Sequence, residues 1–172
     1  MPIPTLTLGG VPIPVHSGPP ELAGESLGGI ARARMSLGGL VQMTHWSGKA
    51  SGTISGQGWM PPGLDGLDYT QPLEFLSLQP ESITGTALAV VLNSTPRGDQ
   101  APWALALVEG EWLPTPCVLD GDLVTITAVT DAVLYTVSWL PKYMVFASRP
   151  SKNLSTGGAS AVHGWSITWE EI

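Results

Sequence analysis

Near its end the chain reads Ala161-Val162-His163-Gly164-Trp165-Ser166-Ile167-Thr168-Trp169-Glu170, a stretch in which apolar and polar side chains alternate. A period of two residues is typical of a β-strand, because successive side chains point to opposite faces of the sheet. The alternation places Trp165, Ile167 and Trp169 on one face of this strand. Such a face needs a covering partner, and we expect the region of Trp46 and Trp59 to provide it.

Short strand-like segments recur along the rest of the chain, whereas helical periodicity is nearly absent. Hairpins are expected around Gly9-Gly10, around Gly38-Gly39 and around Asp120-Gly121, the last because Asp-Gly suits a type I′ turn. Further strands are expected at residues 49–56, 73–78, 82–93, 103–108, 133–139 and 143–147, and a polar loop at 148–160. The best helical candidate is a turn or two at residues 20–24. About a dozen short strands at close spacing predict an all-β fold, a sandwich or a barrel.

The chain changes character at Gln79-Pro80, after which the strand segments become apolar on both faces. We therefore predict two lobes: a β-barrel or sandwich lobe and a small inserted β lobe. Residues 1–81 plus 144–172 form the first lobe in this prediction, so that the amino-terminal strands can cover the Trp face of the final strand. Residues 82–143 form the inserted β-sandwich lobe.

Charge and composition exclude several kinds of partner. The formal net charge is −7, with 7 Lys plus Arg against 14 Asp plus Glu, and a nucleic-acid binder needs a basic face instead. No apolar stretch is long enough to span a bilayer, so membrane insertion is not expected. No signal peptide opens the sequence and Cys117 is the single cysteine, which favours folding in a reducing cytoplasm.

Catalytic motifs are weak throughout. A nucleophilic Cys117 would need one of the three histidines to lower the pKa of its thiol, and its place at the start of an apolar strand favours a buried small hydrophobe instead. The Gly-x-Ser-x-Gly pentapeptide of serine hydrolases does not occur. We therefore expect no enzymatic activity, and a small β hydrolase is the third of three hypotheses.

Metal and cofactor motifs are equally weak. The pairs Asp65/Asp68 and Asp120/Asp122 could each begin a calcium loop, but neither continues with the later oxygen ligands. Asp and Gly populate turns for their own reasons, which explains both pairs better. Phosphate-binding loops are absent as well. We expect neither a metal nor a cofactor.

One loop concentrates large apolar residues: Gly56-Gln57-Gly58-Trp59-Met60-Pro61-Pro62-Gly63-Leu64-Asp65-Gly66-Leu67-Asp68-Tyr69. It is too rich in Gly and Pro for a helix. Its apolar side chains are costly to leave in water, so the loop must pack against its own core or against a neighbour. The candidate interface residues are Trp59, Met60, Pro61, Pro62, Leu64, Leu67 and Tyr69.

Seven Trp residues raise the alternative of a carbohydrate-binding module, because aromatic faces stack on sugars. Trp103 and Trp112 are the candidate sugar contacts. The sequence supplies no ring of Asn, Asp, Gln or Arg around the Trp residues to fix sugar hydroxyls, which favours packing over sugar binding.

Residues 54–69 and the ending Trp165-Ser166-Ile167-Thr168-Trp169-Glu170-Glu171 resemble small proteins encoded in tail-tip gene clusters of long-tailed bacteriophages. The resemblance implies a distal-tail-like virion protein: a β-barrel that forms a ring, commonly of six copies, and a second β lobe that faces outward. Such a ring joins the tail tube to the tail-tip or receptor-binding apparatus and contacts tube and hub proteins. It implies a place in the virion tail after assembly in the host cytoplasm, and no catalytic residues. This chain is shorter than many distal tail proteins, and the alternative is a carbohydrate-binding β-sandwich module for host adhesion.

Overall fold

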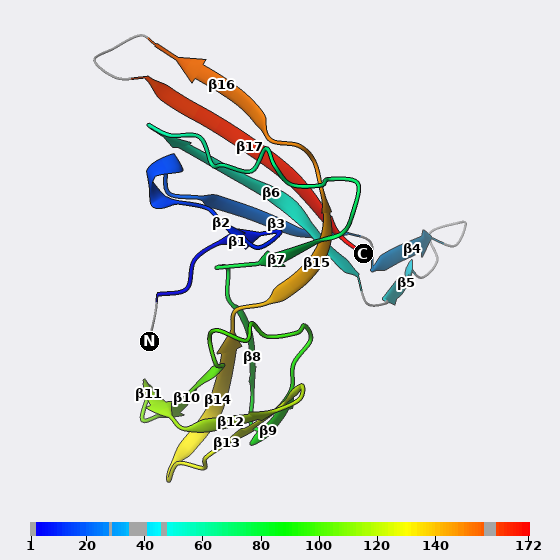
Figure 1. Ribbon diagram of the computed structural model, residues 1–172. Helices are drawn as coiled ribbons and strands as arrows, with labels where there is room; N and C mark the ends of the chain where they lie inside the picture. The colour runs from blue at the N-terminus through cyan, green and yellow to red at the C-terminus, as the bar shows by residue number, and fades with distance from the viewer. Residues whose placement is uncertain (1–2, 28, 35–40, 46–47, 157–160) are drawn as a thin grey trace. The chain divides into compact units, whose positions relative to one another are not determined.

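The computed structural model describes residues 3–27, 29–34, 41–45, 48–156 and 161–172 (Figure 1). It is nearly all β, with 58% strand and 2% helix, which confirms the predicted all-β class. The 3₁₀ turn η1 (Val15–Ser17) supplies the helical residues. No helix among the described residues has the length and apolar character needed to cross a membrane.

Two compact units divide the chain. Unit 1 comprises Met1–Pro12 and Glu74–Tyr143, and unit 2 comprises Ile13–Leu73 and Met144–Ile172. Residues 1–12 and 74–81 therefore group with the middle segment, whereas the sequence prediction placed them in the other lobe. The insert at residues 82–143 stays a prediction.

Unit 1 contains a four-stranded antiparallel sheet in the order β11-β10-β14-β8, formed by β11 (Glu111–Thr115), β10 (Trp103–Val108), β14 (Ala132–Trp139) and β8 (Glu81–Gly85). A three-stranded sheet in the order β12-β13-β9 consists of β12 (Cys117–Asp120), β13 (Leu123–Ile126) and β9 (Ala89–Val91). The core of this unit is a cluster of buried side chains: Leu92, Ala104, Ala106, Val124, Ile126, Tyr135, Val137 and Trp139. Each sheet thus gives one face to the core and leaves the other outside.

The same unit contains the hairpin of β1 (Thr7–Leu8) and β2 (Val11–Pro12), and β1 also pairs with β7 (Leu73–Leu76). The predicted turn at Gly9-Gly10 is confirmed, and both glycines have the positive φ that a type I′ turn requires. The second arm ends at Pro12, because proline cannot donate a ladder hydrogen bond.

The hairpin of β12 and β13 forms as predicted, but the predicted type I′ turn is wrong. Asp120 pairs with Leu123, so the two central residues are Gly121 and Asp122. Only Gly121 has a positive φ, 59°, whereas a type I′ turn needs it at both central positions. Glycine at the first central position alone matches the requirement of a type II′ turn.

Unit 2 is built on a sheet in which β17 (Val162–Glu171) pairs with β16 (Ser151–Ser155) on one side and with β6 (Lys49–Gly58) on the other. β3 (Glu21–Leu27) pairs with β6, and the end of β15 (Lys142–Ala147) pairs with β17. β4 (Ile30–Arg34) and β5 (Val41–His45) form the predicted second hairpin, whose turn lies outside the described residues.

Two predictions fail in this sheet. Residues 20–24 are not helical, because Glu21–Leu27 satisfies its backbone groups by pairing with β6 over its full length. Residues 148–160 are not only loop, because β16 forms there against β17. For residues 20–24 the partner strand β6 begins more than twenty positions further along the chain, so pairing outside the local segment overrides local propensity. For residues 148–160 the partner β17 is the next strand, and the two form a hairpin.

The Trp face of β17 is buried, as predicted: Trp165, Ile167 and Trp169 are 4%, 0% and 6% exposed. Glycines on β6 make room for the indoles. A Cβ built on Gly56 would lie 2.8 Å from the ring of Trp165, and one on Gly52 would lie 3.1 Å from that of Trp169. The η1 turn contributes to the cover, whereas Trp59 is 64% exposed and Trp46 lies outside the described residues.

Candidate functional site

The apolar loop after β6 is partly folded on itself. Pro62 and Leu64 are buried within the chain, and the Tyr69 hydroxyl donates a hydrogen bond to the Leu64 carbonyl at 2.7 Å. Burial, followed by the charge of Asp65, raises the pKa of Tyr69, so this hydroxyl keeps its proton and remains a donor. Pro62 and Leu64 already contribute to the fold of their own chain and are not available to a neighbour.

Trp59 is the most exposed large member of the predicted interface set. Its indole lies 5.3 Å, centroid to centroid, from the imidazole of His16, at an interplanar angle of 47°. The Met60 backbone N–H donates to the His16 carbonyl at 3.3 Å, which ties the start of the loop to η1. Pro61 is exposed beside it, while Met60 and Leu67 are half-buried. The loop therefore presents one positioned aromatic side chain to solvent.

Trp103 and Trp112 lie on the outward face of the β11-β10-β14-β8 sheet, 37% and 44% exposed. Trp112 pairs directly with Leu107, which lies four residues along β10 from Trp103. Both indoles therefore project from the same face, from backbone positions about 14 Å apart. Ser138 stands opposite Trp103 on β14. The structure thus brings together the two residues that the sequence proposed as sugar contacts, and adds hydroxyl groups on the same face.

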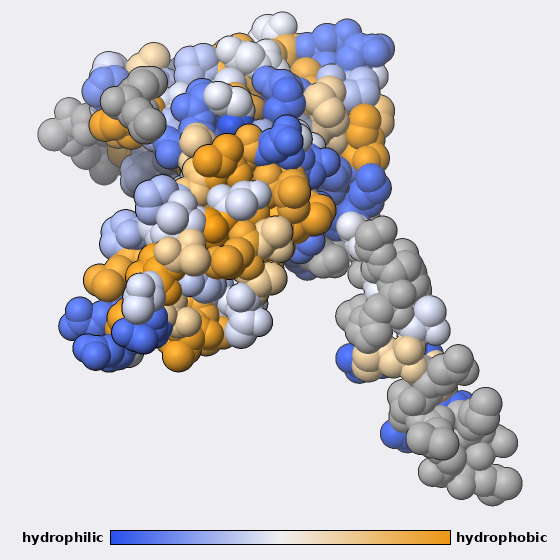
Figure 2. Space-filling model, turned by 90° about the horizontal axis from the view of Figure 1, so that it is seen from below, coloured by the Kyte–Doolittle hydropathy of each residue, from blue (hydrophilic) through white to orange (hydrophobic). Residues whose placement is uncertain are grey.

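A second apolar face lies on the outer side of the β12-β13-β9 sheet. The register places Val91, Val118 and Leu123 on this side, all exposed. Figure 2 shows hydrophobic residues gathered on the surface turned towards the viewer. Exposed apolar clusters of this kind mark interaction surfaces more often than isolated exposed residues do.

The structure places Cys117 at the start of β12, half-buried, where its Sγ–H donates to the Pro102 carbonyl at 3.4 Å. Burial raises the pKa of the thiol, which keeps it protonated. A protonated thiol is a poor nucleophile. The geometry is that of a small packed side chain.

Asp65 and Asp68 both have structural partners. Lys152 forms an ion pair with Asp65, and Asp68 accepts hydrogen bonds from the hydroxyl and backbone N–H of Thr70 at 2.6 and 3.0 Å. These hydrogen bonds lower the pKa of Asp68. In the part of the chain that the structure describes, no group of three or more His, Cys, Asp or Glu side chains could hold a metal ion.

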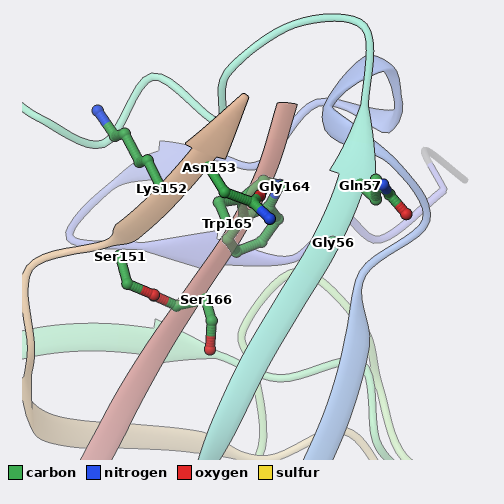
Figure 3. Close-up of a pocket in the computed structure, with 8 residues that line it drawn as sticks. All are labelled: Gly56, Gln57, Ser151, Lys152, Asn153, Gly164, Trp165 and Ser166. Carbon is green, nitrogen blue, oxygen red and sulfur yellow. The ribbon is translucent and has the colours of Figure 1, made fainter. Parts of the chain in front are cut away.

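Sequence reasoning missed a pocket of about 410 Å³ on the sheet of unit 2 (Figure 3). Its lining combines polar side chains with two glycines and one indole, and it comes from three strands: Gly56, Gln57, Ser151, Lys152, Asn153, Gly164, Trp165 and Ser166. No local motif marks these residues, because β6 and β16 are separated by more than ninety positions and meet only through β17. The sequence analysis predicted a loop at residues 148–160, so the strand that carries three of these residues was not expected.

Comparisons with known proteins do not assign this chain to a family. A scan against protein-family models, a search of curated proteins and a search of solved structures each found no match. The basis for a function is therefore the chemistry of the surfaces and side chains described above.

Proposed function

We propose that this protein is a structural assembly protein that works through repeated contacts between copies, in the manner of a distal-tail-like ring at a phage tail tip. The observation that carries the proposal is Trp59, an indole 64% exposed yet positioned by His16 in the loop that resembles tail-tip proteins. Large aromatic side chains in such positions dominate the free energy of protein interfaces.

Exposed apolar surface elsewhere supports assembly as well. The outer side of the β12-β13-β9 sheet carries exposed Val91, Val118 and Leu123. A subunit that repeats around a ring needs two different contact surfaces, because each copy meets one neighbour on each side. The Trp59 loop and the outer face of the β12-β13-β9 sheet are two candidate contact surfaces. Covering one large aromatic side chain contributes roughly 2–3 kcal/mol to the free energy of association.

Replacing Trp59 with Ala should weaken assembly and leave the fold of the single chain intact, because the indole is mostly in solvent in the isolated chain. The measurement is the mass in solution by light scattering, followed by negative-stain microscopy. Phe146→Ala is the matched control, since Phe146 is also a half-exposed aromatic of unit 2. Assembly by Trp59→Ala equal to that of the unaltered chain would contradict the role of this loop, and an unaltered chain that stays monomeric at every concentration would contradict self-assembly.

The second candidate function is carbohydrate binding for host adhesion, which the shared face of Trp103 and Trp112 favours. Two indoles on the same face of one sheet can stack on separate sugar rings of one chain. Trp103→Ala and Trp112→Ala should each lower glycan binding about tenfold, since an aromatic contact contributes about 1 kcal/mol or more. Glycan-array signals that persist in both variants would exclude this face as the binding site.

A further inference from the structure

The pocket of unit 2 is built on one face of β6, β17 and β16. Asn153, Gly164 and Gln57 lie directly opposite one another on these three strands, so their side-chain positions share a face. Gly164 has no side chain, so the Asn153 amide lies over it, and the Gln57 amide lies on the neighbouring strand β6 (Figure 3). The next row on the same face carries three hydroxyls: Ser151, Ser166 and Ser55.

Gly164 sets the position of one amide. A Cβ built on Gly164 would overlap Oδ1 of Asn153, so the Asn153 amide occupies the place that any other residue would fill. The side chains of Gln57 and Asn153 make no hydrogen bond with other described residues, and both are exposed. Each amide offers two donors and one acceptor, so both are available to a ligand.

The charge of the pocket is balanced. Lys152 is the charged residue of its lining, and its ammonium group is paired with the Asp65 carboxylate. The remaining polar groups are amides and hydroxyls, which bind neutral groups. The floor strand β17 is paired on both sides, so its backbone offers no free edge to an extended peptide.

We propose that this pocket binds a neutral saccharide unit, whose hydroxyls are held by hydrogen bonds from the amides of Asn153 and Gln57. A volume of about 410 Å³ lies within the range of small-molecule sites, roughly 300–1,000 Å³. Trp165 is 4% exposed and packs against Gly56, so the ring does not stack on the ligand. Binding therefore rests on hydrogen bonds and is weak, on the order of 1 mM. This activity is additional to the proposed assembly.

Saturation-transfer NMR on the full chain with D-glucose, D-galactose and N-acetyl-D-glucosamine, each alone, tests the proposal. At least one sugar should give a transfer signal. Asn153→Ala and Gln57→Ala should each weaken that binding about tenfold, because each removes hydrogen bonds to the ligand. Ser155→Ala is the matched control: Ser155 lies on the same strand and face as Asn153, outside the pocket lining, and its loss should change nothing.

Gly164→Ala provides a second variant that keeps both amides but displaces the one of Asn153, and it should weaken binding as Asn153→Ala does. The absence of a signal from all three sugars, at a concentration ten times the expected dissociation constant, would overturn the proposal. So would a signal that survives Asn153→Ala and Gln57→Ala and disappears in Trp112→Ala. Trp59→Ala should leave the sugar signal unchanged, which separates this result from the test of assembly.

Discussion

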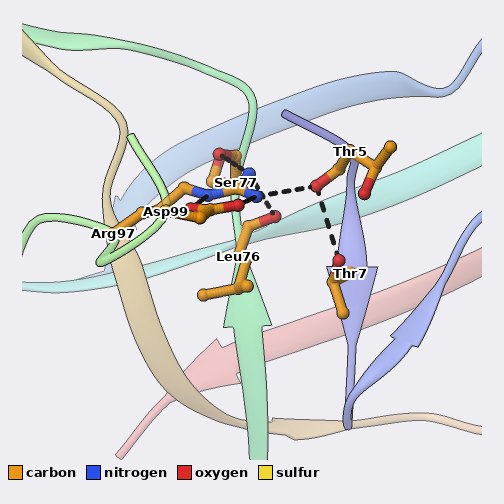
Figure 4. A network of polar contacts seen from close by, with 6 residues as sticks. All are labelled: Thr5, Thr7, Leu76, Ser77, Arg97 and Asp99. Atoms are coloured by element: carbon orange, nitrogen blue, oxygen red, sulfur yellow. Dashed lines mark hydrogen bonds and ion pairs between the residues drawn. The ribbon is translucent and has the colours of Figure 1, made fainter. Parts of the chain in front are cut away.

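Replacing Arg97 with Ala is expected to lower the free energy of unfolding by about 2–4 kcal/mol, because its guanidinium is buried and all of its N–H groups donate hydrogen bonds. Arg97 is 2% exposed. It donates hydrogen bonds to the carbonyls of Thr5 and Ser77, both at 3.0 Å, and of Leu76 at 3.5 Å (Figure 4). It also donates to both carboxylate oxygens of Asp99, at 2.8 and 2.7 Å. The variant would remove the guanidinium donor from the carbonyl of buried Ser77, whereas the exposed Thr5 carbonyl still accepts a hydrogen bond from the Thr7 hydroxyl.

Urea unfolding followed by Trp fluorescence and circular dichroism measures this loss. Lys142→Ala is the control, because the Lys142–Glu74 ion pair is partly exposed on both sides and contributes under about 1 kcal/mol. Equal losses for Arg97→Ala and Lys142→Ala would show that the buried network does not hold unit 1 together.

Acid titration adds a second readout of the same contact. The hydrogen bond from Arg97 is the main cause that lowers the pKa of Asp99 in the folded chain. A carboxyl whose pKa is lower in the folded than in the unfolded chain stabilises the fold above its unfolded pKa, about 4, and this contribution is lost as the pH falls through the folded pKa. Asp99→Asn should remove that part of the acid sensitivity, and the effect should be small because Asp99 is exposed.

Trp165→Ala is the second large effect, with an expected loss of about 3–5 kcal/mol in the free energy of unfolding. The substitution empties the space between Gly56 and the η1 turn. It also removes the Trp165 Nε1–H group, which donates a hydrogen bond to the Ser17 carbonyl at 2.8 Å. Ser17 is fully buried, so water cannot replace this donor. A cavity and an unpaired carbonyl then add to each other.

Trp165→Phe separates the two contributions, because it keeps part of the ring and loses the donor, so its loss should be the smaller. Trp59→Ala is the matched control in unit 2 and should change the unfolding free energy little, since Trp59 is mostly exposed. Urea titration of the three variants gives the comparison. A loss for Trp165→Ala as small as that for Trp59→Ala would contradict the assigned place of this indole in the core.

The pattern of the sequence predicted the strands better than their partners. Alternation along β17 correctly indicated that Trp165, Ile167 and Trp169 share a buried face, because a period of two places alternate side chains on one side of any strand. It did not indicate what covers them, since the glycines of β6 that receive the indoles lie more than one hundred positions away. Residues 20–24 were misjudged for the same reason.

By itself, the sequence determined the all-β class, the hairpins at Gly9-Gly10 and Asp120-Gly121, and the buried face of the last long strand, because periodicity and turn chemistry act over a few residues. Only the tertiary structure decided which apolar residues remain outside and which polar groups meet. Leu64 is buried while Trp59 is exposed in the same loop, and Gln57 and Asn153 flank a glycine of a third strand. These outcomes depend on pairing between distant segments, which no local pattern encodes.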